Sequence, residues 1–538
     1  MKTYNSGNIS GGIEMYHDKK ILIGVSGEEK VYLYPKMANR HGMIAGATGT
    51  GKTITLKVLA ESFSDCGVPV FLADVKGDLA AMCKPGTMND NIQKRMDEMG
   101  LAEAGYDFSA YPTTYWDIYG EKGMPLRTTI SEMGPLLLSR ILDLNEVQSD
   151  ILTIIFKIAD DQGLLLLDTK DLRSMIQYVS DHAKDYAEEY GNMAKQSLAA
   201  ILRSVVALEA EGADKFFGET ALNITDWFNT VDGKGMIQVL DCQKLIHSPT
   251  MYSTFMLWML SELFETLPEA GDLAKPRMVF FFDEAHMLFD SASKTLLNKI
   301  EQVVKLIRSK GVGIYFITQS PADIPDPVLA QLGNKVQHAL RAYTPKEQKA
   351  AKAAAESYRV NPDFDTYEVL TTLGTGEALV SVLDEAGVPT VVKQCKILPP
   401  QSQMGALDDG ARKSEIQGNV LYVKYSQEID RESAYELLKK KVVAEEEAEE
   451  AAAVEVAAEK QRQKDEAAAQ KAKEKAEAAE AKKKKTAIKN VASSATGTIG
   501  REIGKQVGNA VGGKFGKTLG GNIGASLGRG LLNTLFKL

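Results

Sequence analysis

Cysteine is scarce in this chain, and its spacing suggests neither a metal site nor a disulfide framework. The 538 residues include four cysteines, which lie far apart and form no C-x-x-C pair. Structural zinc sites and small disulfide-rich domains depend on closely spaced cysteines. The sequence therefore favours a protein of the reducing cytoplasm. The four positions are Cys66, Cys83, Cys242 and Cys395.

Long apolar runs are also missing. The first seven residues begin no apolar stretch of signal-peptide length. No uncharged apolar run elsewhere approaches the roughly 20 residues of a membrane span. We therefore expect a cytoplasmic protein. With 44% hydrophobic residues, the chain can bury more than one core, so we expect two or three domains.

Positive charge is in short supply over most of the chain. The net charge is −9, but residues 482–538 hold eleven Lys or Arg and one acid, which leaves −19 on residues 1–481. A body that acidic would not bind nucleic acid over its general surface. Any contact with nucleic acid must use a local basic channel or the C-terminal tail.

The strongest motif occupies residues 42–53. It fits the pattern G-x-x-x-x-G-K-[ST], with a short apolar strand before it and an amphipathic helix over residues 54–63 after it. This context favours a phosphate-binding loop over a chance glycine-rich turn. Backbone N–H groups of such a loop converge on phosphate oxygens at the positive end of the helix. The predicted binding residues are Gly46, Ala47, Thr48, Gly49, Thr50, Gly51, Lys52 and Thr53.

The motif predicts a nucleoside triphosphate, ATP, together with Mg²⁺. Lys52 is expected to reach the β- and γ-phosphates, and the Thr53 hydroxyl to bind Mg²⁺. A second buried strand, residues 67–74, ends at Asp74. An acid at the carboxyl end of a parallel strand faces the ligand crevice. A turn or helix-capping aspartate is an equal alternative for this position.

A third buried strand delivers two adjacent carboxylates. Five apolar residues, 278–282, precede Asp283 and Glu284. Asp283 is predicted to hold Mg²⁺, and Glu284 to orient and deprotonate the attacking water. The alternative is a buried strand that ends at an acidic turn. For His286, a packing or hydrogen-bonding role is at least as plausible as a catalytic one.

Two polar residues farther along the chain are weaker candidates. A helix over residues 291–310 ends at Gly311, with Arg308 in its last turn. The strand at 312–318 is followed directly by Gln319, which could sense the γ-phosphate or position water. The alternatives are a helix-capping arginine and an ordinary first loop residue.

The pattern of strands and helices predicts an α/β fold. We expect the P-loop core at 41–80 and 220–400, a helical insertion at 81–219, and two strands within 1–40 that flank the core sheet. The expected helices are 130–144, 150–159, 172–190, 193–211, 250–267 and 346–357, and the expected strands are 21–25, 31–34, 236–241, 336–340 and a hairpin of 377–383 with 388–392.

The composition changes after residue 400. Residues 401–432 resemble a polar linker, and 433–489, rich in Ala, Glu and Lys, favour a solvated helix about 80 Å long. The basic tail, 490–538, carries a glycine at every fourth position from Gly500 to Gly528. Small residues at this spacing allow helices to approach closely. A flexible glycine-rich tail is the alternative, since glycine costs a helix about 1 kcal/mol per residue.

With these motifs placed, the chain resembles the HerA-like branch of the HerA/FtsK superfamily of RecA-type P-loop ATPases. More narrowly, it is similar to the bacterial family of HerA-like helicase C-terminal domain proteins. The resemblance covers roughly residues 5–400. The segments that carry it are Asn39-Arg-His-Gly42, the P-loop, Asp74-Val-Lys-Gly-Asp78, Asp283-Glu-Ala-His286 and Thr318-Gln-Ser-Pro321.

This resemblance implies a RecA-like core in which Lys52, Thr53, Asp283 and Glu284 take the usual ATPase roles. It also implies a sensor role for Gln319. The remaining matches are the acid after the second strand, Asp74, and an arginine that reaches a neighbouring subunit's ATP, Arg308. The family also implies a ring, with a hexamer favoured. Its N-terminal β-barrel finds no counterpart in residues 1–40, and the long helix and glycine tail are not part of its pattern.

Several functions remain open at this point. The leading interpretation is an ATP-hydrolysing ring motor that translocates on DNA. Its rivals are a remodelling or signalling ATPase that acts with an unknown protein partner and no nucleic acid, and a nucleotide-gated scaffold. A kinase is disfavoured, because Glu284 would activate the water that a kinase must exclude. The +10 charge of residues 482–538 also fits a peripheral contact with an anionic membrane.

Overall fold

The computed structural model describes residues 15–101, 105–290 and 294–490. The chain divides into two compact units, Met1–Val443 and Ala444–Leu538, and each is described by itself below. The glycine repeat from Gly500 to Gly528 lies outside the described residues, so the expectations for it stay predictions.

The first unit is built on one large mixed sheet. In the described part of the chain, 13 strands join it, and its central part runs β13-β4-β12-β11-β5-β10-β6 with every neighbour parallel. This α/β arrangement is the predicted RecA-like P-loop core. The parallel strands are β4 (Gly42–Ala45), β5 (Val70–Asp74), β6 (Thr113–Asp117), β10 (Ile237–Asp241), β11 (Met278–Phe282), β12 (Val312–Thr318) and β13 (Asn334–Gln337).

Apolar side chains cover both faces of these strands, as expected for a parallel sheet buried on both sides. In β11, Phe280 and Phe282 join one hydrophobic cluster, while Val279 and Phe281 join the cluster on the opposite face. The alternation follows from the two-residue period of a strand. One continuous apolar run thus supplies two cores.

Antiparallel strands extend the sheet beyond β13. The order on this side is β1-β2-β15-β14, with β3 paired to β2, so the first described strands flank the core. The hairpin partner of β14 lies later than the sequence predicts, at 393–397 rather than 388–392. Within 388–392, Pro389 forms an isolated antiparallel bridge with Leu383, and its missing backbone donor disfavours a longer ladder there. The strands are β1 (Tyr16–His17), β2 (Lys20–Ser26), β3 (Glu29–Leu33), β14 (Glu377–Ser381) and β15 (Lys393–Ile397).

Helices pack on both faces of the sheet. The cluster on one face contains residues of α1 (Lys52–Asp65) and α2 (Asp90–Met99), and the other contains α9 (Pro249–Thr266) and α11 (Lys294–Ile307). A smaller third cluster joins α13 (Pro345–Glu356) and α14 (Thr366–Thr372) to β14. The short helices α10 (His286–Asp290) and α12 (Asp326–Leu329) pack in the same cluster as α9.

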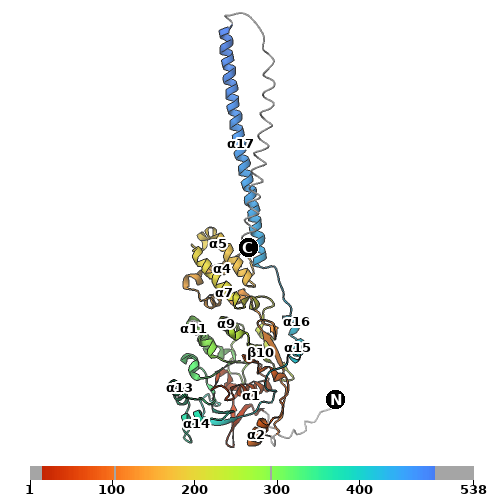
Figure 1. Ribbon diagram of the computed structural model, residues 1–538, viewed down its shortest axis with the longest axis vertical. Helices are drawn as coiled ribbons and strands as arrows, with labels where there is room; N and C mark the ends of the chain where they lie inside the picture. The colour runs from red at the N-terminus through yellow and green to blue at the C-terminus, as the bar shows by residue number, and fades with distance from the viewer. Residues whose placement is uncertain (1–14, 102–104, 291–293, 491–538) are drawn as a thin grey trace. The chain divides into compact units, whose positions relative to one another are not determined.

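The inserted helices form a group beyond α9 and α11 (Figure 1). The first three each begin with a capping box, which satisfies backbone donors at the helix start. The helix expected at 172–190 is split at His182, whose ring bonds back to the carbonyl of Tyr178. The helices are α3 (Ile130–Ile141), α4 (Glu146–Asp161), α5 (Thr169–Asp181), α6 (Ala183–Tyr190), α7 (Lys195–Ala210) and α8 (Ala213–Phe216).

The range 81–219 is not helical throughout. It contains β6, which pairs with β10 inside the central sheet, and the two-residue strand β7 (Met124–Pro125). The β6 sequence, Thr-Thr-Tyr-Trp-Asp, combines β-branched and aromatic residues that favour strands. The prediction of a helical insertion at 81–219 is therefore wrong at β6, whose strand signal is only five residues long. A second pair, β8 (Thr230–Val231) and β9 (Lys234–Gly235), lies outside the main sheet.

Residues 401–432, whose composition is that of a linker, are packed against the core. They carry two short helices, α15 (Asp409–Gly418) and α16 (Tyr422–Tyr425). Arg412 and Tyr425 are buried. Polar composition alone did not reveal that several of these polar groups have buried partners.

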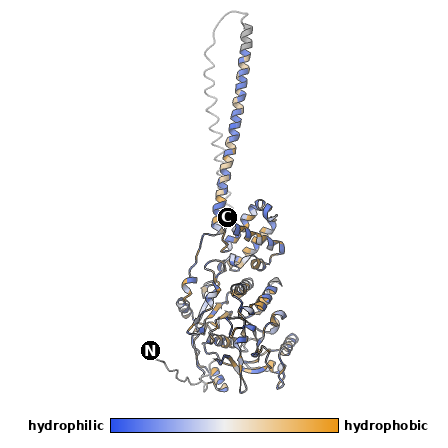
Figure 2. Cartoon of the chain, turned by 180° about the vertical axis from the view of Figure 1, so that it is seen from behind, coloured by the Kyte–Doolittle hydropathy of each residue, from blue (hydrophilic) through white to orange (hydrophobic). Residues whose placement is uncertain are grey.

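The last described element is α17 (Ala434–Asn490), a helix of 57 residues. Its first turns belong to the first unit, and from Ala444 it belongs to the second. Its residues are mostly exposed, and blue and paler bands alternate along its length in Figure 2. Within the described residues, no helix has both the length and the apolar character needed to cross a membrane.

Candidate active site

The P-loop connects the carboxyl end of β4 to the first turn of α1. Gly46, Gly49 and Gly51 have φ angles of 152°, 75° and 117°, in the region that L side chains rarely adopt. A Cβ atom at Gly51 would lie 3.1 Å from Cα of Gly376. The glycines of the motif are therefore required by the backbone path and by close packing.

Lys52 lies inside this loop. Its ammonium donates to the carbonyl oxygens of Gly46, at 2.7 Å, and Ala47, at 3.1 Å. The side chain is 7% exposed, and burial lowers the pKa of Lys52, while the charge of Glu284 acts in the opposite direction. The predicted phosphate ligand thus lies within the loop, and the charge of Glu284 is within electrostatic reach of it.

A buried histidine supports the loop from behind. The imidazole of His338 lies 2.8 Å through Nε2 from Oγ1 of Thr55, and 2.8 Å through Nδ1 from the carbonyl oxygen of Glu377. Burial lowers the pKa of His338 to about 4. A neutral ring that donates to Glu377 and accepts from Thr55 satisfies both contacts. The sequence predicts only that this residue lies in a strand at 336–340, because no nearby motif indicates its contacts with Thr55 and Glu377.

The turn before β14 also contacts the loop. The backbone N–H of Gly376 donates to the carbonyl of Thr50 at 2.9 Å. The guanidinium of Arg95, on α2, donates to the carbonyl of Thr375 at 2.8 Å. These contacts fix the side of the P-loop that faces away from the acidic strand ends. No sequence motif predicts these contacts, because the partners are about 280 to 330 positions apart in sequence.

Asp283 and Glu284 follow β11 at the same edge of the sheet. Asp283 is 5% exposed, and burial together with the charge of Glu284 raises its pKa to about 6. Its Oδ1 accepts from the backbone N–H of Glu284 at 2.9 Å. Glu284 has a φ of 47°, a left-handed conformation that costs a non-glycine residue roughly 1–3 kcal/mol and clusters at functional sites.

Lys76 forms an ion pair with Glu284. The ammonium lies 2.8 Å from Oε1, and the carboxylate is 10% exposed. Burial alone would raise the pKa of Glu284, but the contact with Lys76 brings it below its usual value. His286 approaches the other carboxylate oxygen, with Nδ1 3.4 Å from Oε2. Lys76 lies in the Asp74-to-Asp78 segment, yet only the folded chain reveals its partner.

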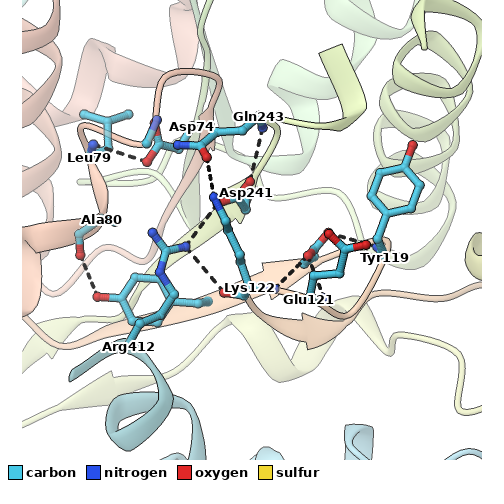
Figure 3. A network of polar contacts seen from close by, with 12 residues as sticks. Asp74, Leu79, Ala80, Tyr119, Glu121, Lys122, Asp241, Gln243 and Arg412 are labelled. Carbon is cyan, nitrogen blue, oxygen red and sulfur yellow. Dashed lines mark hydrogen bonds and ion pairs between the residues drawn. The ribbon is translucent and has the colours of Figure 1, made fainter. Parts of the chain in front are cut away.

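Asp74 stabilises the turn that carries Lys76 (Figure 3). One carboxylate oxygen accepts from the N–H of Gly77 at 2.7 Å and the other from Leu79 at 3.2 Å. Burial and the neighbouring Asp78 raise the pKa of Asp74 to about 7. The geometry matches the turn-aspartate alternative, and the turn carries Lys76, the partner of Glu284.

Gln319 is exposed and follows β12, which pairs with the P-loop strand so that Thr318 lies opposite Ala45. Arg308 lies at the other end of the same strand. Because β12 has 7 residues at about 3.3 Å each, Arg308 is some 20 Å from this edge. Arg308 is exposed there and cannot reach the P-loop of its own chain. Arg341 instead donates to the carbonyls of Thr371 and Leu373.

The residues at this edge suit a magnesium–nucleotide ligand. A hydroxyl, Thr53, and a buried carboxylate, Asp283, offer the oxygen ligands that Mg²⁺ prefers. The ammonium of Lys52 donates to a carbonyl of the loop and can turn from it to phosphate oxygens. The donor set and the glycine backbone together fit the group that the motif predicts.

Comparison with protein families gives one match across most of the chain. The family described as Helicase HerA-like C-terminal matches residues 20–523. The match continues beyond residue 400, through the charged helix and into the glycine repeat. The expectation that the helix and tail lie outside the family pattern is therefore wrong.

Individual relatives are more distant. The chain is 23% identical over 379 residues to the DNA double-strand break repair helicase HerA of Sulfolobus acidocaldarius, covering 69% of this chain and 68% of that protein. It is 21% identical over 390 residues to the protein of the same name in Sulfurisphaera tokodaii, with 70% of each chain covered.

Comparison with solved structures gives matches at low sequence identity. The plasmid coupling protein TrwB, bound to a non-hydrolysable GTP analogue, gives a TM-score of 0.49 at 14% identity and covers 73% of this chain and 93% of that one. VirB4 of Thermoanaerobacter pseudethanolicus gives 0.44 at 18% identity, with 72% and 98% covered.

Proposed function

The chain belongs to the Helicase HerA-like C-terminal family, and from this premise we propose that it hydrolyses ATP. The observation that supports this most directly is the convergence of the P-loop lysine with a buried Asp-Glu pair at one edge of a parallel sheet. Lys52 and Glu284 influence each other's pKa, which is the arrangement that a triphosphate between them would need.

The roles of the binding residues follow from their chemistry. The backbone N–H groups of residues 46–51 bind phosphate oxygens, and Lys52 neutralises the β- and γ-phosphates. Thr53 and Asp283 would hold Mg²⁺, which would offset phosphate charge. Asp74 supports this edge by fixing the turn at residues 75–79.

The water-activating role belongs to Glu284. Lys76 pairs with Oε1 of this carboxylate, so Oε2 can accept a proton from water without loss of the ion pair. Gln319, next to the P-loop strand, senses the γ-phosphate or positions that water. Because Arg308 is at the far end of β12, we assign it to a neighbouring subunit's ATP within a ring, for which a hexamer is favoured.

We further propose DNA as the polymer on which this motor acts. The support is the name of the relatives from two archaea, DNA double-strand break repair helicase HerA. The −19 charge of residues 1–481 favours the second candidate, an ATPase that remodels a protein partner and binds no nucleic acid. A nucleotide-gated scaffold that assembles through its C-terminal segments is the third candidate.

The proposed domain division follows the sequence with one adjustment. The ATPase core comprises 41–80 and 220–400, the insertion lies within 81–219 apart from β6, and residues 1–40 flank the sheet. Residues 401–432 join the core to the helix at 433–489, and 490–538 form the basic tail.

One assay separates the candidates. ATP hydrolysis by the purified full chain is measured with no polymer, with single-stranded DNA and with double-stranded DNA, at low and moderate salt. A DNA motor hydrolyses ATP several-fold faster with DNA, and the stimulation declines as salt rises. Equal rates in all three conditions contradict the DNA assignment and favour the remodelling ATPase.

A further inference from the structure

A segment between the last sheet strand and α17 is attached to the core through polar contacts, several of them buried, and through apolar residues such as Leu407 and Tyr425. We name residues 399–433 the C-terminal strap. It includes α15 and α16, which lie along one side of the first unit in Figure 1. Its polar anchors are Ser402 to Glu61, Arg412 to Asp241, Tyr425 to Asp226, Arg431 to Glu219 and Ser433 to Asp171.

One end of the strap is attached to the P-loop helix. Lys57 and Glu61, on α1, are almost fully buried although both are ionisable. Lys57 donates to the carbonyl of Gln403 at 2.8 Å, and the Glu61 carboxylate accepts from the backbone N–H of Gln401 at 2.8 Å. Buried charges need such partners, so this part of the strap is required by the helix that begins at Lys52.

The next anchor lies beside the acidic strand ends. Arg412 on α15 and Asp241 at the end of β10 form an ion pair with Nη1 and Oδ2 3.1 Å apart, and their side chains are 7% and 6% exposed (Figure 3). Asp241 is paired in register with Asp74 on the adjacent strand β5. Arg412 thus reaches the strand next to the one whose turn carries Lys76.

Gln243 connects this ion pair to the Lys76 turn. Its backbone N–H donates to Oδ1 of Asp241 at 3.1 Å. Its side-chain amide packs directly on Gly77, since a Cβ atom there would lie 1.7 Å from Nε2. The ammonium of Lys122 donates to the same side chain. The turn is therefore fixed from one side by Asp74 and from the other by Gln243.

We propose that Arg412, an anchor of the strap, is a positioning residue for Lys76 and Glu284. The route runs from Arg412 to Asp241, Gln243, Gly77 and Lys76. At the C-terminal end of the strap, the Ser433 hydroxyl and the N–H of Tyr435 both donate to Asp171, which connects the start of α17 to the insertion. This inference rests on the proposed ATPase function.

The first test does not require ATP hydrolysis. Hydrogen exchange is measured in the full-length chain for the backbone amides of residues 75–79, whose Gly77 and Leu79 N–H groups bond to Asp74. Arg412→Gln is expected to speed their exchange about 10-fold through local opening of the turn. The matched control is Arg431→Gln, which removes an exposed ion pair of the same strap and should leave these amides unchanged.

The second test measures kcat and KM for ATP in the same variants. Arg412→Gln should lower kcat about 10-fold, as expected for a misplaced base, and change KM less than about 2-fold. Wild-type protein and Glu284→Gln are measured alongside. If those two hydrolyse ATP at the same rate, the proposed function fails. If wild type is active and Arg412→Gln matches it in kcat and exchange, only the positioning inference fails.

A double variant separates positioning from stability. Arg412→Met with Asp241→Leu removes both buried charges, so neither is left without a partner. It should keep a melting temperature near that of wild type, with kcat still reduced and the turn still exchanging fast. Recovery of both wild-type kcat and wild-type exchange would contradict the inference, because the pair would then serve folding alone. The double variant also decides the question if Arg412→Gln alone does not fold.

Discussion

The ammonium of Lys76 lies 2.8 Å from Oε1 of Glu284, and these two residues come from turns that follow neighbouring strands. The carboxylate predicted to activate water is therefore paired with a cation in this structure. The pairing explains why the pKa of Glu284 is below its usual value although the residue is largely buried. It also places the turn at residues 75–79 beside the carboxylate that we propose activates water.

Lys52→Ala is expected to weaken nucleotide binding and hydrolysis together. The ammonium is the main positive charge of the loop, and a charge-assisted hydrogen bond contributes about 1.5–3 kcal/mol, or roughly 10- to 100-fold in affinity. Binding of a fluorescent ATP analogue and steady-state hydrolysis are measured in parallel. Lys30→Ala, at an exposed lysine of β3, is the control and should behave as wild type. Unchanged affinity in Lys52→Ala would argue against the phosphate role.

Arg308→Ala should abolish cooperative hydrolysis while nucleotide binding and oligomer formation remain. The reason is its position at the end of β12 away from its own P-loop. Mixtures of Lys52→Ala and Arg308→Ala subunits should recover part of the activity, because some interfaces then pair an intact P-loop with an intact arginine.

Arg341→Ala is the comparison for this experiment. Arg341 donates to two backbone carbonyls, so its loss should reduce stability in every subunit regardless of mixing. If no mixture recovers activity with Arg308→Ala, and Arg341→Ala complements instead, the role in the neighbouring subunit belongs to Arg341.

Acid should destabilise the first unit through His338. Its pKa falls to about 4 from an ordinary 6.5, so between these values the unfolded chain binds a proton that the folded chain does not. The free energy of unfolding therefore decreases as the pH falls from 6.5 to 4, by about 3 kcal/mol for a shift of this size. The buried His41, whose pKa is also about 4, adds a change in the same direction.

Urea unfolding at pH 7 and pH 5 measures this effect. His338→Asn should be less stable than wild type at pH 7, because the contact with Thr55 is altered, but should lose less stability between the two pH values. His17→Asn is the control, since that side chain is 67% exposed. An identical pH dependence in His338→Asn and wild type would exclude His338 as a source.

Deletion of residues 490–538 should leave the chain folded and able to bind ATP, while it reduces higher-order assembly or binding to anionic liposomes. The prediction rests on the glycine repeat and the basic charge of this segment, read from the sequence. Solution mass and liposome co-sedimentation are the measurements. If neither changes, the segment is a tail without these roles. Loss of nucleotide binding would instead show that the segment belongs to the catalytic fold.

Motifs with short sequence spacing could be predicted, and sites assembled from distant residues could not. The P-loop and the Asp283-Glu284 pair are contiguous, so their residue types fix the local chemistry. Lys76 was visible beside Asp74, but its ion pair depends on the register of β5 and β11. His338 meets Thr55 only because β13 lies beside the P-loop strand.

The fold shows the same division. Long buried strands such as β11 and β12 have strong apolar signals and were predicted. The short strand β6 lies among helices and has a mixed sequence, so tertiary pairing with β10 decides its structure. Polar composition predicts a linker at residues 401–432, because composition does not show that Arg412 and Asp241 are partners.

ATP hydrolysis by Glu284→Gln compared with wild type is the most direct test of water activation by Glu284. The substitution keeps the size of the side chain and removes the proton acceptor, so ATP affinity should remain near that of wild type while turnover falls by roughly 100-fold or more. Glu269→Gln, at an exposed carboxylate paired with Lys310, should hydrolyse ATP normally. Near-normal turnover by Glu284→Gln, with binding intact, would contradict the assignment of this edge of the sheet as the site of water activation.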